Sequence, residues 1–179
     1  MNFKNIFSIL FFISLFFTIS AFQLPKKTTK KVAKEIKNVF NTTDYILDSV
    51  SIPSSFEGKL KSSLNNSNFF SIKLNDTLIG FAYVDSAPSK TADFDYLILL
   101  DPKLVILKTK VLMYREEYGG EIASTRWLKQ FIGKTFTNSY EYPKDISAIS
   151  GATISVRSMT YSVDCFMNSI RVLHENNIL

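Results

Sequence analysis

Apolar residues recur at two periods along this chain, and the change of period separates a helical segment from a β-rich one. Over residues 26–43, Val32, Ile36 and Phe40 fall at helical spacing while lysines take the other face, which predicts an amphipathic helix. Residues 56–68 are polar and rich in Ser and Asn, which indicates a short helix and a loop. From residue 69 the apolar positions alternate, as they do in strands. Strands are predicted at 69–74, 78–84, 94–100 and 104–114.

Helical spacing returns in the C-terminal third of the chain. A helix is predicted over 124–132, with Trp127 and Phe131 facing inward and Gly133 at its C-cap. The last helix is predicted from about residue 152 to 174, because apolar residues repeat there at intervals of three and four. These are Val156, Met159, Val163, Phe166, Met167, Ile170 and Leu173. The pattern predicts an α+β fold, in which a sheet of about four antiparallel strands packs with helices and the long C-terminal helix follows a Ser-Gly-Ala-Thr loop.

The first 21 residues have the pattern of an export signal. Lys4 provides a positive start, residues 6–17 form an almost unbroken apolar run, and Ser20-Ala21 offers small residues for cleavage. The apolar run is about 15 residues long, whereas a membrane-spanning helix needs about 20. A cleaved signal is therefore favoured over an N-terminal anchor, and an anchor extended through Phe22 stays open as the alternative.

The net charge of +5 is concentrated just after this segment. Six lysines between residues 26 and 37, together with Glu35, account for all of it, because beyond residue 38 fourteen Lys and Arg face fifteen Asp and Glu. This distribution argues against nucleic-acid binding. A basic run after an export signal either lies against an anionic membrane surface or is solvated.

The chain is poor in residues for catalysis and metal binding. With one cysteine, Cys165, and one histidine, His174, it has no internal disulfide, no Ser-His-Asp or Cys-His pair and no soft-metal cluster. The sequence contains neither a dinucleotide-binding fingerprint nor a P-loop. Cys165 is interpreted as a core residue of the last helix and His174 as a surface residue. No catalytic or metal-binding residue is predicted.

The most informative segment is the loop that leads into the last helix. The first turn of a helix has unpaired N–H groups and a partial positive charge, so it can bind a phosphate. Gly151 and Ala152 have almost no side chain, which leaves room for a bulky group, and Thr153 presents a hydroxyl beside those N–H groups. The same residues also fit a plain N-capping sequence, and the residues alone favour that alternative.

The segment resembles the flavinylation motif of the FMN-binding domain family. That family includes FMN-carrying subunits of the sodium-translocating NADH:quinone reductase and of the Rnf complex, and stand-alone exported flavin carriers, which this short chain resembles more. The family pattern is Asp-x-x-Ser-Gly-Ala-Thr with a polar residue two positions later. The matching residues are Ser150, Gly151, Ala152, Thr153 and Ser155. The resemblance implies that Thr153 accepts FMN as a phosphoester, from FAD, through a flavin transferase that requires magnesium.

A second stretch is similar to the family, and one position departs from it. Glu116 and Gly119 match a Glu-Thr-Pro-Gly-like turn that lies near the flavin ring in the family, and residues 131–134 match its Phe-x-Gly-Lys. The departure is Ser147, which stands where the family motif has an acid; the nearest acid is Asp145. The resemblance covers roughly residues 69–174, and it implies slow or absent modification if the transferase needs the acid in register.

These observations predict three parts: an export signal or anchor over 1–21, a basic helix and linker over 22–68, and an FMN-binding domain over 69–179. The function that the resemblance implies is an exported electron carrier with covalent FMN on Thr153. It would shuttle electrons between membrane redox proteins and an extracytoplasmic acceptor, without a substrate of its own. Its partners would be the flavin transferase and membrane electron-transfer proteins, in the periplasm or on the outer face of the cytoplasmic membrane. A non-flavinylated exported binding module of the same fold and an FMN-dependent reductase of a small molecule remain as alternatives.

Overall fold

A computed structural model describes residues 26–179 of the chain, so the predicted export signal lies outside the described residues. In order, the elements are α2 (Lys26–Phe40), β1 (Ile46–Ser49), η1 (Ser54–Phe56), β2 (Phe69–Leu74), β3 (Thr77–Ala87), β4 (Phe94–Leu100), β5 (Ile106–Met113), η2 (Gly120–Ala123), α3 (Thr125–Leu128), η3 (Lys129–Phe131) and α4 (Thr153–Glu175). Among the described residues, no helix is both long and apolar enough to cross a membrane.

The strands form one antiparallel sheet in the order of the sequence, β1-β2-β3-β4-β5. Each strand therefore pairs with its neighbour in the chain through a short connection. Between β2 and β3, Asn75 and Asp76 both have positive φ, at 49° and 61°, as a two-residue hairpin turn of this hand requires. The α+β class that the sequence predicts is confirmed.

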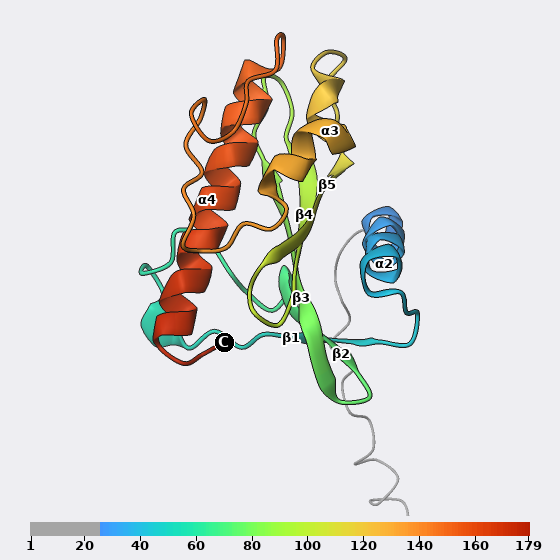
Figure 1. Ribbon diagram of the computed structural model, residues 1–179, viewed down its shortest axis with the longest axis vertical. Coiled ribbons are helices and arrows are strands. Elements are labelled where there is room, and N and C mark those ends of the chain that lie inside the picture. Colours follow the sequence, from blue (N-terminus) through green and yellow to red (C-terminus); the bar gives the residue numbers. More distant parts are fainter. Residues whose placement is uncertain (1–25) are drawn as a thin grey trace, which may run out of the picture.

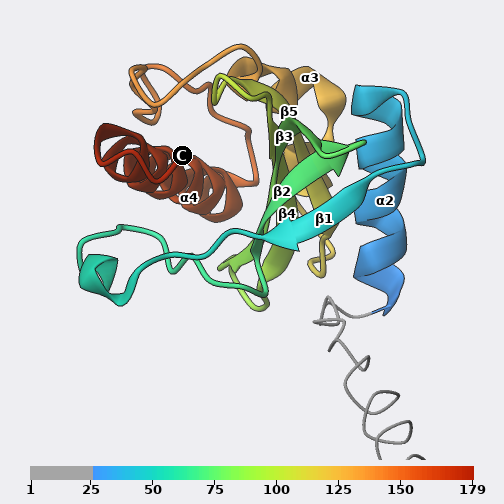
Figure 2. The same ribbon diagram turned by 90° about the horizontal axis from the view of Figure 1, so that it is seen from below.

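Helices cover both faces of the sheet, as Figures 1 and 2 show, with α2 on one face and α4 on the other. Along β4 the side chains alternate between two buried clusters: Tyr96 and Ile98 pack toward α4, and Leu97 and Leu99 pack toward α2. A strand that is covered on both faces reads as an almost continuous apolar run, and β4 has this pattern. The sheet thus forms the middle layer between α2 and α4.

Three predicted elements need correction. The short helix predicted within residues 56–68 is replaced by turns after η1, since the Asn65 and Asn68 side chains bond the nearby backbone instead. The sheet has five strands instead of about four, because β1 is a short edge strand that is held by pairing with β2 and has little buried side chain to signal it. The helix predicted over 124–132 is divided into α3 and η3, although its apolar residues Trp127, Leu128 and Phe131 are buried as expected. Cys165 is buried in α4 and His174 is exposed, as the sequence predicts.

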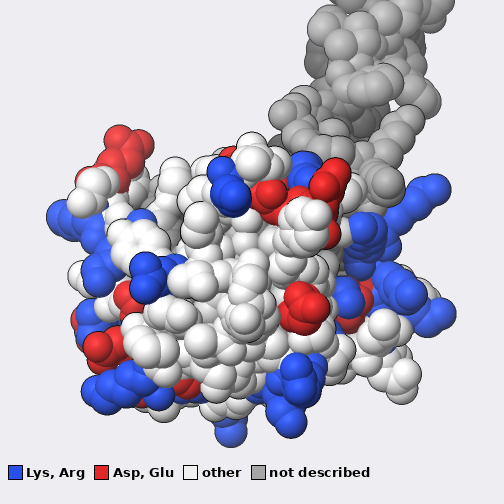
Figure 3. Space-filling view, turned by 90° about the horizontal axis from the view of Figure 1, so that it is seen from above, with Lys and Arg blue, Asp and Glu red and all other residues white. Residues whose placement is uncertain are grey.

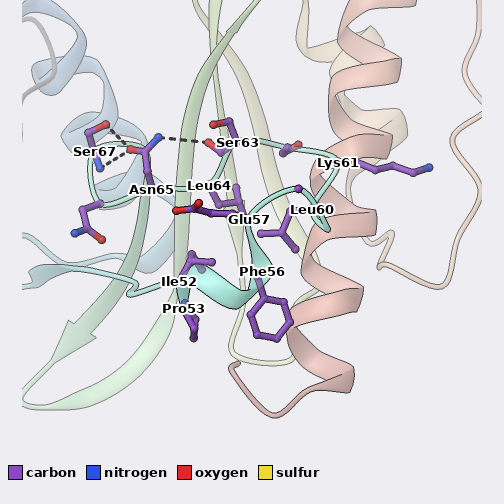
Figure 4. Close-up of a pocket in the computed structure, with 13 residues that line it drawn as sticks. Ile52, Pro53, Phe56, Glu57, Leu60, Lys61, Ser63, Leu64, Asn65 and Ser67 are labelled. Carbon is purple, nitrogen blue, oxygen red and sulfur yellow. Dashed lines mark hydrogen bonds between the residues drawn. The ribbon is translucent and has the colours of Figure 1, made fainter.

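A hollow of about 700 Å³ lies in the connection between β1 and β2. Figure 4 shows that its lining comes from one continuous stretch, residues 52–67, with the apolar side chains of Phe56 and Leu60 among polar ones. None of the lining residues belongs to the segments that the sequence predicts to hold a flavin. Those segments meet at another place, where α4 begins.

Candidate functional site

Three segments that are distant in sequence meet where α4 begins. They are the first turn of α4, the turn that follows β5 (114–120), and the connection between β3 and β4 (88–93). Figure 1 shows all three at the upper end of the molecule. The Oγ of Ser155 in α4 lies 2.5 Å from the Oγ of Ser89 and 3.0 Å from the Oη of Tyr114, so side-chain hydrogen bonds join the three segments.

Side-chain hydroxyls make the hydrogen bonds of this cluster. The hydroxyl of Tyr114 also lies 3.0 Å from the backbone oxygen of Tyr118, which can only accept. In the contacts of Ser155 with Ser89 and with Tyr114, either hydroxyl can be the donor. Because Ser155 is only 2% exposed, its hydroxyl serves this internal chain, and the side chain does not face a ligand.

Thr153 is the first residue of α4, and its side chain is exposed. The N-cap position is Ala152, and no side chain caps the helix there. Among the described residues, the backbone N–H groups of Thr153, Ile154 and Ser155 have no backbone acceptor. The N-capping alternative therefore gains no hydrogen bond here, while the free N–H groups and the positive end of a 23-residue helix suit an anion.

The two small residues before Thr153 have different surroundings. Gly151 has φ of 78°, which favours glycine, and a Cβ at this position would have no atom within 4 Å. Ala152 is only 4% exposed, so it does not leave room for a ligand as the sequence suggested. Open space beside Thr153 is thus found at Gly151, and Ser150 before it is also exposed.

Ala152 packs against the turn that follows β5. A Cβ placed on Gly119 would lie 3.0 Å from the Ala152 Cβ and 2.9 Å from the Tyr114 Oη, and the φ of Gly119 is 79°. Glycine is therefore required at residue 119 both by the backbone conformation and by the close approach of α4. This contact sets the distance between the turn and Thr153.

Glu116 lies in the same turn and holds the β3–β4 connection. Its carboxylate accepts hydrogen bonds from the Thr91 N–H (2.6 Å), the Thr91 hydroxyl (2.7 Å) and the Ala92 N–H (3.2 Å). The bonds from Thr91 lower the pKa of Glu116 to about 2. The adjacent Arg115 pairs with Asp95 at 2.7 Å, at the start of β4. The carboxylate of Glu116 thus holds the β3–β4 connection in place.

The low pKa of Glu116 predicts a pH dependence. Since its pKa in the folded protein is about 2, below the ordinary 4.5, the stabilisation is complete above pH 4.5 and is lost as the pH falls toward 2. In Glu116→Gln, the free energy of unfolding, measured by urea denaturation, should fall less between pH 5 and pH 3 than in the wild type. Glu117→Gln, at the exposed neighbouring position, is the control and should keep the wild-type dependence. If the free energy of unfolding fell equally in Glu116→Gln and the wild type between pH 5 and pH 3, Glu116 would not be the source of this pH dependence.

Two hydrogen bonds hold the backbone of Ser147, the residue that stands where the family motif has an acid. The Ser147 N–H donates to the Gln130 side chain at 2.9 Å, and its carbonyl accepts from the Trp127 indole at 2.8 Å, whereas its side chain is exposed. Asp145 does not act in its place, because its carboxylate accepts the Glu141 N–H at 2.9 Å and a bond from Ser139, both within its own turn. Asp145 therefore does not replace the motif acid that is absent at residue 147.

Two exposed apolar side chains flank the site. Tyr118, next to Gly119, is 81% exposed, and Ile154, next to Thr153, is 50% exposed. Figure 3 views the end where α4 begins, and the middle of this face consists largely of uncharged residues. Sequence reasoning missed Tyr118, Ser89 and Tyr114; the only available signal was that Tyr118 occupies the proline position of the family's turn.

The comparisons with known proteins agree with this geometry. Residues 91–166 match the model of the FMN-binding domain family, a stretch that begins at Thr91, includes the turn after β5 and contains the first turns of α4. No curated protein matches the chain. The family match and the site cover the same part of the chain, and the match supports FMN as the ligand of this domain. The match, over residues 91–166, is to the same FMN-binding domain family that the motif before α4 resembles.

Proposed function

We propose that this protein is an exported electron-transfer flavoprotein that carries FMN covalently, as a phosphoester on Thr153. The observation that carries the proposal is the position of Thr153: its exposed side chain stands at the first residue of α4, where no side chain caps the helix. Ser150, Gly151, Ala152 and Ser155 complete the motif around it.

The residues present fit the phosphate of FMN. The unpaired N–H groups at the start of α4 can donate to phosphate oxygens, and the helix terminus stabilises such an anion by about 0.3 to 2 kcal/mol. The absence of neighbours around Gly151 leaves room for the phosphate and the chain attached to it. Covalent attachment would prevent loss of the cofactor outside the cytoplasm.

The turn after β5 is a suitable surface for the flavin ring. Gly119 contacts Ala152. Tyr118 precedes Gly119 and Thr153 follows Ala152 in the chain, so this contact brings Tyr118 and Thr153 near each other. Tyr118 is exposed although its carbonyl is bonded to Tyr114, which gives an aromatic side chain on an ordered backbone. An aromatic ring in this position can stack on the flavin, with Ile154 providing an adjacent apolar surface.

The chemistry that FMN supplies when bound is reversible electron transfer, and the chain positions and tunes it. A carrier needs no general acid or base of its own. Glu116, the acid that the resemblance places near the flavin ring, is engaged by Thr91 and Ala92, and the Ser155 hydroxyl is engaged by Ser89 and Tyr114. This arrangement favours a carrier over a reductase with its own substrate.

The partners and the location belong to the same proposal. A flavin transferase using FAD and magnesium would load Thr153, and membrane electron-transfer proteins would exchange electrons with the exposed flavin. The export signal predicted over 1–21 supports a site of action in the periplasm or on the outer face of the cytoplasmic membrane.

The test of the carrier function is a redox titration of the flavin-loaded protein. We expect complete reduction and reoxidation over repeated cycles, followed by flavin absorbance, and no steady turnover when small soluble electron acceptors of physiological type are supplied. Irreversible bleaching would exclude a carrier. Steady turnover of a soluble substrate by the isolated protein would favour the reductase.

The position of the ring is tested in the same titration with two tyrosine variants. Tyr118→Ala should shift the midpoint potential, because it removes the aromatic surface beside Thr153. Tyr161→Ala is the control, since Tyr161 is also exposed, at 70%, but lies two turns further along α4. Equal midpoint potentials in Tyr118→Ala and the wild type would show that Tyr118 does not contact the flavin ring. This result would not bear on the attachment of FMN to Thr153.

A second candidate function rests on Ser147. If the transferase requires the acid that this position lacks, the protein would remain an exported binding module without covalent flavin. An unmodified mass after export, together with a colourless protein, would favour this alternative.

A further inference from the structure

The outer face of α2 carries a stripe of lysines. Lys30, Lys34 and Lys37 are exposed, and Lys26 and Lys27 precede them in the same helix. At about 100° per residue, all five positions fall within an arc of about 100°. No ion pair involves Lys30, Lys34 or Lys37 within the part of the chain that the structure describes.

The opposite face of α2 is fixed on the sheet. Val32 and Ile36 are buried in the cluster between α2 and the sheet. Lys31 turns inward and donates to the Leu112 carbonyl of β5. This packing prevents α2 from rotating, so the lysine stripe faces outward.

The single acid of α2 is kept out of the stripe. The Glu35 side chain is only 12% exposed and lies 3.9 Å from Lys108 of β5. The outward face of α2 therefore carries charge of one sign. Because the remainder of the chain is close to neutral, this face also holds the net positive charge of the protein.

We infer that α2 is a docking surface for an anionic lipid bilayer. A straight helix of 15 residues with lysines along one side presents its charges in a nearly flat row, which suits the plane of a membrane surface. The apolar run at residues 6–17 ends just before α2 in the sequence, which would keep this helix close to a membrane during export. Figure 3 shows Lys and Arg gathered along the edge that α2 occupies. The inference does not depend on covalent flavin.

The docking surface also sets an orientation. In Figure 2, α2 and α4 lie on opposite faces of the sheet. With α2 on the bilayer, the sheet lies between the lipid and α4. Thr153, in α4, would then lie on the far side of the sheet from the lipid, so a membrane electron-transfer protein would reach it with a part that projects beyond the bilayer.

The test is the binding of the exported full chain to lipid vesicles, measured by co-sedimentation. Vesicles of phosphatidylcholine alone are compared with vesicles that also contain phosphatidylglycerol. The variant Lys30→Gln/Lys34→Gln/Lys37→Gln removes the stripe while keeping good helix formers. The matched control is Lys59→Gln/Lys103→Gln/Lys129→Gln, which removes the same charge from exposed lysines outside α2. Circular dichroism verifies that each variant is folded.

We expect tighter binding to the anionic vesicles, weakened by salt, and a loss of roughly a hundredfold in the α2 variant, since each lysine near the surface contributes about fivefold. The control should lose little, although both variants have the same net charge. Equal binding to the two kinds of vesicle, or an α2 variant that binds like the wild type, would overturn the inference. Preferential binding of an oligonucleotide in competition would also overturn it.

Discussion

Thr153→Ala is expected to abolish covalent flavin completely. In a host with an active flavin transferase, the exported wild-type protein should gain the mass of one FMN less one water, and Thr153→Ala should gain none. The reason is that the exposed Thr153 hydroxyl stands at the uncapped start of α4, where a phosphate is stabilised. Intact-mass spectrometry gives the result directly.

Thr125→Ala is the matched control for this measurement. Thr125 is also an exposed threonine at the first residue of a helix, α3, but it lacks the Ser-Gly-Ala sequence before it. This variant should be modified like the wild type. Retention of the added mass in Thr153→Ala would exclude Thr153 as the attachment residue.

A Ser147→Asp variant separates the possible causes of a negative result. The Ser147 side chain is exposed, so an aspartate can be introduced without displacing the backbone bonds to Gln130 and Trp127. If the wild type is unmodified or modified slowly, Ser147→Asp should raise the modified fraction. An unmodified wild type that Ser147→Asp does not rescue would leave the binding module as the better account.

Gly119→Ala is expected to be the most destabilising single change in the site. A non-glycine residue at φ of 79° costs about 1–2 kcal/mol, and the new Cβ would lie 2.9 Å from the Tyr114 Oη and 3.0 Å from the Ala152 Cβ. Overpacking of this kind adds about 1–3 kcal/mol. We therefore expect a loss of about 2–5 kcal/mol in the free energy of unfolding, measured by urea denaturation.

Gly133→Ala isolates the contribution of the close contact. Gly133 has nearly the same backbone conformation, with φ of 81°, but a Cβ there would meet no atom within 4 Å. Gly133→Ala should lose only the cost of the strained backbone, about 1–2 kcal/mol of the free energy of unfolding. If the two variants lost equal stability, the contact between Gly119 and Ala152 would have no energetic importance. The modified fraction of the folded Gly119→Ala protein then shows whether this contact also matters for flavin loading.

Much of the fold could be predicted from periodicity. Strands 69–74 and 94–100 have the predicted bounds, and α4 begins and ends one residue after the predicted positions. These elements have strong apolar repeats, because each is buried against the rest of the core. The edge strand β1 could not be predicted, since its stability comes from pairing with β2.

The sequence by itself determined the α+β class, the long last helix, the basic segment and the resemblance to the FMN-binding domain family, because these depend on local spacing and on a contiguous motif. Only the tertiary structure decided which motif residues face outward. Thr153 is exposed, whereas Ser155 and Ala152 are buried and Glu116 holds the loop at Thr91. The physical reason is that these roles depend on partners 25 to 66 residues away in the chain, which packing brings together.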